Sequence, residues 1–147
     1  MIISYSGSLT KWQKFDRIID LYIELKKIFK NTYFLVLTPD VESAEKKLLR
    51  ELNHGDFTVL FVENQKLINY LSYSDLGLLL RDENIINKVS APIKVKDYLN
   101  AGVPMLASSK IGDTDYYFRT YNLGYSIETH NFKAELSNNE SAIRDLL

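Results

Sequence analysis

The residues best suited to binding chemistry are Ser90, Lys94 and Asp97, which fall within about two turns of a single predicted helix. Pro92 is typical of a first helical turn, so a hydroxyl and free backbone amides are expected at the helix start. Such a helix end carries about half a positive charge and favours phosphate, and Lys94 adds a full charge. The Asp97 carboxylate can accept two hydrogen bonds from a ribose diol. The alternative, which composition alone favours, is an ordinary solvated helix face.

A second candidate is the loop from Ser6 to Gln13, which contains a single glycine, Gly7. The loop lacks both the G-x-G-x-x-G of dinucleotide-binding folds and the G-K-[ST] of a P-loop. Nicotinamide oxidoreduction and P-loop hydrolysis are therefore disfavoured. Gly7 would let a ligand approach the backbone closely, although a simple turn explains it equally well.

These residues lie on a chain that alternates predicted strands and helices. Apolar runs predict strands at 2–6, 33–37, 58–62, 76–80, 104–107 and 124–127, and helical spacing predicts helices at 15–29, 42–52, 67–71, 92–101, 113–122 and 138–147. Repeated β-α units indicate an α/β fold: a Rossmann-like, doubly wound, mainly parallel sheet of about six strands with helices on both faces. Ligands in such sheets bind at the carboxyl ends of the strands, so the loops that follow the strands are the informative ones.

Composition excludes several function classes. The chain has 147 residues, which fits one domain, and a net charge of -1, which argues against a dedicated nucleic-acid binder. It has no cysteine and two histidines far apart, so neither thiol chemistry nor a local zinc motif is expected. No apolar run is long enough to cross a membrane. Asp113-Thr-Asp115 matches a D-x-D metal string, but its position favours a helix cap, so no metal is expected.

The chain resembles the C-terminal, donor-binding domain of bacterial GT-B glycosyltransferases of the family 4-like polysaccharide enzymes. Residues 90–104 are similar to the family's S-P-x-K-x-x-E-Y-L-x-x-G-x-P pattern. Residues 5–13 match its first strand and loop, and residues 74–81 match the strand before the donor helix. The matches run in order over most of the chain.

The resemblance implies that a nucleoside-diphosphate sugar is the donor, with no cofactor or metal. Asp97 would bind the ribose hydroxyls, the amides around Gly7 and Ser8 would face the phosphates, Glu63 and Asn64 would contact the base, and Ser90 to Lys94 would hold the diphosphate. The chain departs from the family at Ser8, where an arginine is usual, and at Gln13-Lys14, where Lys-Gly is usual. It also has Asp97 where Glu is commoner and Val89 where a second Glu is usual. We expect Lys11, Lys14, Arg81 or Lys94 to replace the missing cations.

Its length indicates one domain of a two-domain enzyme, with residues 1–147 forming the donor half. A glycan or lipid-linked acceptor would then bind through an N-terminal domain, and the full-length protein would be cytoplasmic or peripheral to the inner membrane surface. The isolated chain should transfer no sugar. The alternative is a non-catalytic flavodoxin-like or regulatory nucleotide-binding module, because Ser6-Gly-Ser-Leu-Thr partly matches a flavin phosphate loop.

Overall fold

All six predicted strands form, and they pair in one parallel sheet in the order β3-β2-β1-β4-β5-β6. The structure is a computed structural model that describes residues 1–81 and 93–147. Its strands are β1 (Ile2–Ser6), β2 (Tyr33–Leu37), β3 (Phe57–Leu60), β4 (Leu76–Leu79), β5 (Met105–Ser108) and β6 (Gly124–Ile127). The predicted doubly wound parallel sheet is confirmed.

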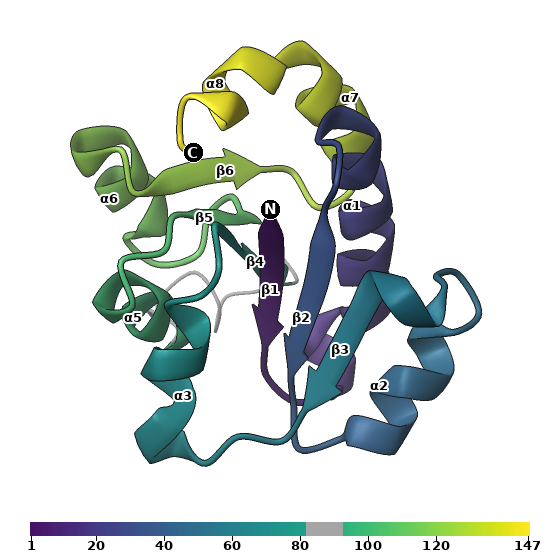
Figure 1. Cartoon of the computed structure of the whole chain (residues 1–147). Helices are drawn as coiled ribbons and strands as arrows, with labels where there is room; N and C mark the ends of the chain where they lie inside the picture. The colour runs from purple at the N-terminus through teal and green to yellow at the C-terminus, as the bar shows by residue number, and fades with distance from the viewer. Residues whose placement is uncertain (82–92) are drawn as a thin grey trace.

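Helices connect the strands and cover both faces of this sheet (Figure 1). The described helices are η1 (Lys11–Gln13), α1 (Phe15–Ile28), α2 (Val41–Leu48), η2 (His54–Asp56), α3 (Asn64–Leu71), α5 (Ile93–Asn100), α6 (Thr114–Tyr121), α7 (Phe132–Asn138) and α8 (Glu140–Arg144). None of them is long and apolar enough to traverse a bilayer.

The strands are buried on both sides, so the core divides into two clusters of apolar side chains. One cluster joins the sheet to α1, α2, α7 and α8 and includes Tyr22 and Phe132. The other joins the opposite face to α3, α5 and α6 and includes Leu71, Tyr98 and Phe118. This two-sided burial explains why the strands read as continuous apolar runs in the sequence.

Helix α5 lies unusually close to the sheet because β4 offers it a glycine. A Cβ built on Gly77 would lie 2.5 Å from Cε1 of Tyr98. The buried Tyr98 hydroxyl donates a hydrogen bond to the Ser4 carbonyl of β1, at 3.1 Å. Helix α5 is thereby fixed against the two central strands.

Two local predictions were only partly right. The predicted last helix at 138–147 is present as the shorter α8, and a further helix that was not predicted, α7, precedes it. Asp113 occupies the N-cap position of α6 but makes no capping hydrogen bond with its side chain. The acid that is used there is Asp115, whose carboxylate accepts hydrogen bonds from the Lys110 backbone and the Ser126 hydroxyl. That pairing ties α6 to β6 across the chain, which local spacing does not reveal.

Candidate functional site

The strand order reverses between β1 and β4, and the candidate site lies at this reversal. Strands β2 and β3 follow β1 on one side, and β5 and β6 follow β4 on the other. The connections therefore diverge and leave a crevice at the carboxyl ends of β1 and β4. Gly7 directly follows β1, and Arg81 comes two residues after β4.

Lys94 of α5 reaches across to Gly7. A Cβ built on Gly7 would fall on the Lys94 ammonium, and it would lie 2.6 Å from Lys94 Cε. Gly7 also has a φ of 148°, a conformation that side chains rarely adopt. Only glycine therefore fits here. The turn interpretation of Gly7 misses this contact, because Lys94 lies 87 residues further along the chain.

Among the described residues, the groups in direct contact with the Lys94 ammonium are neutral. Its Nζ donates a hydrogen bond to Gln13 Oε1 at 2.7 Å and lies 5.0 Å from the centre of the Tyr5 ring. Burial, together with the positive charge of Arg81, lowers the pKa of Lys94 to about 7, although Asp97 opposes this. The described part of the chain therefore compensates this charge only partly.

The loop that carries Gly7 is held in place from both sides. The Tyr5 hydroxyl donates to the Ser8 carbonyl at 2.7 Å, and the Leu9 amide donates to Asp40 Oδ2 at the same distance. Asp40 follows β2, so the loops after the first two strands are joined. Ser8 itself contributes a hydroxyl 3.2 Å from that of Thr10. The loop is thus preformed.

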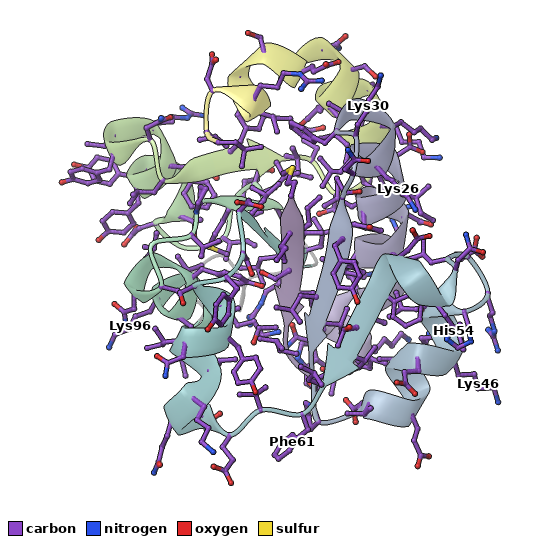
Figure 2. All side chains as sticks on the ribbon, in the orientation of Figure 1. Lys26, Lys30, Lys46, His54, Phe61 and Lys96 are labelled. Carbon is purple, nitrogen blue, oxygen red and sulfur yellow. The ribbon has the colours of Figure 1, made fainter. Side chains whose placement is uncertain are left out.

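A pocket of about 180 Å³ opens beside Gly7, at the carboxyl ends of β1, β2 and β3. Figure 1 shows these three ends together at the lower edge of the molecule, and in Figure 2 Phe61 projects from the same edge. Phe61 is 65% exposed. The pocket combines apolar walls with hydroxyl, amide and backbone groups, and its lining includes Ser6, Gly7, Thr38, Phe61, Asn64 and Leu67.

Arg81 is anchored through its backbone by two buried hydroxyls. Its amide donates to Ser108 Oγ at 2.9 Å, and its carbonyl lies 3.3 Å from both Ser108 Oγ and Thr129 Oγ1. The two hydroxyls also bond to each other at 2.8 Å. These groups come from β5 and from the segment after β6, so the end of β4 is fixed by its neighbours. Burial lowers the pKa of Arg81, which Tyr5 partly offsets.

Asp97 lies one helical turn beyond Lys94 and is half-buried. Burial raises the pKa of its carboxyl, while the neighbouring Lys96 and Lys94 lower it. Within residues 1–81 and 93–147, no hydrogen bond or ion pair engages this carboxylate. The chemical arrangement is then an acid, two cations and a glycine loop around one crevice.

The structure separates the remaining predicted residues. Lys11 and Glu63 are exposed, and Glu63 lies 3.9 Å from Lys66 in a surface ion pair. Ser90 lies outside the described residues. Sequence reasoning missed Tyr5 and Gln13 as neighbours of the Lys94 ammonium. The sequence offered one signal for Gln13. It stands where the family that the chain resembles has a lysine, so a cation from another part of the chain was to be expected beside it.

Neither a protein-family model nor a curated protein matches the chain. Solved structures, in contrast, match the chain in fold. S. aureus TarM, crystallised with UDP, superposes with a TM-score of 0.70 at 14% identity over 99% of this chain. The C-terminal domain of the glycosyl transferase group 1 family protein LpcC from Francisella tularensis gives 0.69 at 13% identity, also over 99%. The pneumococcal O-GlcNAc transferase GtfA, solved with UDP and GlcNAc, gives 0.67 at 13% identity over 97%.

The fold is that of a GT-B glycosyltransferase C-terminal domain. The chain spans 30% of TarM and of GtfA, and 77% of the separately solved LpcC domain. This GT-B fold matches the sequence resemblance in architecture. The identities are too low to carry individual site residues across, so the roles of the residues rest on the geometry described above.

Proposed function

We propose that this GT-B domain binds the nucleoside-diphosphate part of a sugar-nucleotide donor. The observation that carries the proposal is the contact between Gly7 and Lys94 at the strand-order reversal. A bare backbone next to a buried, incompletely compensated ammonium is suited to a diphosphate, because phosphate oxygens need both close approach and charge. Arg81 stands near enough to influence the pKa of Lys94 and would add a second cation.

The adjoining groups fit the rest of a nucleotide. Asp97 would accept hydrogen bonds from the ribose diol, as an acidic residue does in dinucleotide folds. The pocket between Gly7, Phe61 and Asn64 would receive the base, with the exposed Phe61 ring as a surface for stacking. Lys11 and Ser8 would contact the phosphates from the loop, and Glu63 would lie at the rim of the base pocket.

The GT-B fold supports a wider activity, which belongs to the same proposal. A second domain would bind a glycan or lipid-linked acceptor and complete the cleft, in a cytoplasmic or membrane-peripheral enzyme. Two separated domains are needed to orient donor and acceptor, and orientation can supply roughly 7–11 kcal/mol of barrier lowering. The isolated 147-residue chain would accordingly bind a donor and transfer no sugar.

The direct test is titration calorimetry of the chain with UDP, GDP, ADP and FMN, supported by thermal unfolding. A ligand at 100 times its Kd stabilises the protein by about 2.7 kcal/mol. We expect one nucleoside diphosphate to bind and FMN not to. Binding of FMN alone would favour a flavodoxin-like module, and no binding at millimolar concentration would contradict the proposal.

Two pairs of variants assign the roles. Lys94→Met should weaken diphosphate binding and spare the nucleoside, whereas Lys96→Met, two residues further along α5 and projecting outward in Figure 2, should change neither. Asp97→Asn should weaken a ribonucleotide roughly tenfold, from the loss of a charged hydrogen bond of about 1.5 kcal/mol, and a 2'-deoxynucleotide less. The exposed Asp145→Asn is its control. Equal effects of both members of a pair would refute the assignment.

A further inference from the structure

Gln13 has a distinct place in the site, because among the described residues it is the one that accepts a hydrogen bond from the Lys94 ammonium. It is the last residue of η1, two residues before the start of α1, and only 7% of its surface is exposed. Its Oε1 accepts the 2.7 Å hydrogen bond from Lys94 Nζ. Across the two described stretches of chain, it is the one hydrogen-bond acceptor of that ammonium. A buried polar side chain fixed against another at this distance constrains where the ammonium lies.

The groups that face the ammonium determine what this contact achieves. From β1 comes the Tyr5 ring, whose hydroxyl has its pKa raised by burial and stays neutral. From the end of β4 comes the positive charge of Arg81, and from α5 itself the carboxylate of Asp97. The acceptor from η1 is an uncharged amide. The one negative group, Asp97, makes no ion pair with Lys94 within residues 1–81 and 93–147.

We propose that Gln13 is a positioning residue that holds the Lys94 ammonium over Gly7 without neutralising it, so that its charge is kept for a diphosphate. The inference rests on the proposed donor binding and names the residue that adapts the site. A carboxylate at the same place would compete with the ligand for the ammonium. An apolar residue there would release the ammonium from the glycine loop.

A consequence is that diphosphate binding takes up a proton. Near neutral pH the ammonium is incompletely protonated in the free protein, and a bound diphosphate stabilises its charged form. Between pH 7.5 and 8.5 the terminal phosphate, with a pKa of about 6, is already ionised and the uracil ring is still neutral, so any change in affinity there belongs to the protein. UDP affinity should then fall with rising pH, by up to about tenfold for each pH unit.

The experiment compares the parent chain with Gln13→Glu and Gln13→Met, and with Asn100→Asp as the matched control. Asn100→Asp adds one exposed acid to the far end of α5. The pKa of Lys94 is followed by the ¹³Cε resonance of labelled lysine, which is assigned by its loss in Lys94→Arg. Inorganic pyrophosphate, UDP and uridine are titrated into each variant, and circular dichroism checks that each is folded.

We expect Gln13→Glu to raise the pKa of Lys94 by a unit or more, to weaken pyrophosphate and UDP at pH 7.5 by roughly tenfold, and to flatten the pH profile of UDP binding. Gln13→Met should weaken both anions without raising the pKa. Uridine affinity and the Asn100→Asp control should not change. An unfolded Gln13→Met would leave the isosteric Gln13→Glu to decide, because the glutamate retains the acceptor.

The outcomes separate this inference from the donor proposal. Lys94 titrating identically in the parent and in Gln13→Glu would overturn the positioning role, whatever nucleotide binds. Pyrophosphate binding that responds to Gln13, without binding of any nucleoside diphosphate, would support the positioning role and refute the donor function. Failure of both pyrophosphate and UDP to bind the parent chain would overturn both.

Discussion

Two polar clusters lie at the same edge of the sheet and are built in opposite ways. The Ser108–Thr129 cluster consists of two buried hydroxyls that bond to each other and to the Arg81 backbone. The Lys94 cluster consists of Lys94, Gln13, Tyr5 and Gly7, and it sets a cation against a neutral amide and an aromatic ring. The first satisfies its polar atoms internally. The second retains a charge for which residues 1–81 and 93–147 supply no ion pair.

The difference separates a structural use of polarity from a binding use. Buried hydroxyls that complete one another's hydrogen bonds give rigidity, and they need no ligand. A desolvated charge costs stability, and a protein retains it where a ligand can compensate it. We therefore expect changes in the Lys94 cluster to act mainly on binding, and changes in the Ser108–Thr129 cluster to act mainly on folding.

The largest effect is expected from Gly7→Ala. The new Cβ would occupy the place of the Lys94 ammonium, and the backbone at φ 148° would be strained. We expect UDP affinity to fall by more than roughly 100-fold, about 2.7 kcal/mol, with a stability loss of about 1–3 kcal/mol. Calorimetry and urea unfolding measure the two. Gly55→Ala, where a Cβ meets nothing within 4 Å, is the control, and similar losses in both variants would remove the distinction.

The pH dependence of folding tests the cost of the unpaired charge. The pKa of Lys94 falls from 10.5 to about 7 on folding, so between these values the unfolded chain holds more protons and stability rises with pH. Each pKa unit corresponds to about 1.4 kcal/mol. Urea unfolding at pH 6, 7.5 and 9 should show a rise in the parent and in Lys96→Met that Lys94→Met lacks. Parallel curves for all three would contradict a desolvated Lys94.

Ser108→Ala probes the other cluster. It removes the acceptor of the Arg81 amide and a partner of the Thr129 hydroxyl, both in buried surroundings. We expect a loss of about 1–3 kcal/mol in the free energy of unfolding, with UDP affinity changed only a few-fold. The neighbouring Ser109→Ala should stay within about 0.5 kcal/mol. A loss of binding without a loss of stability would reverse the roles assigned to the two clusters.

The smallest effect is expected at Lys14, which joins η1 to α1 in a left-handed conformation with φ 51°. Lys14→Gly relieves the steric cost of that conformation but adds backbone freedom to the unfolded chain. The balance should be a gain of about 0.5–1 kcal/mol in unfolding free energy, with UDP binding unaffected. A destabilised variant would show that the Lys14 side chain contributes more than its backbone conformation costs.

The sequence predicts the sheet well because buried strands leave a simple signal. Runs such as Tyr33–Leu37 and Gly124–Ile127 carry apolar residues on both faces, and their bounds agree with the structure. Helix α7 was missed, because the prediction placed a single last helix at 138–147, where the structure has only the shorter α8. Asp115 was missed for a related reason, since its partner Ser126 lies on another element.

The candidate site was only partly predictable. Lys94, Asp97 and Gly7 stand out by residue type, helix position and resemblance, whereas Gln13 and Tyr5 acquire their importance only from a fold that brings α5 over β1. Polar residues of ordinary type carry no local signal of such contacts. The strand order, which creates the crevice, is likewise a property of the whole chain rather than of any segment.

Arginine side chains fix both ends of helix α1 against other parts of the chain. Near its start, Arg17 donates to the Thr129 carbonyl at 3.0 Å and covers the Phe132 ring. At its end, Arg144 of α8 donates to the Ile28 carbonyl at 2.7 Å and covers the Phe29 ring. The last two helices, α7 and α8, therefore pack against the two ends of α1. A fragment cut before Phe132 would lose the Phe132 ring and both Arg144 contacts, and it would keep only the hydrogen bond from Arg17 to Thr129. Helix α1 would then be held less firmly, along with the Gly7 loop that leads into it.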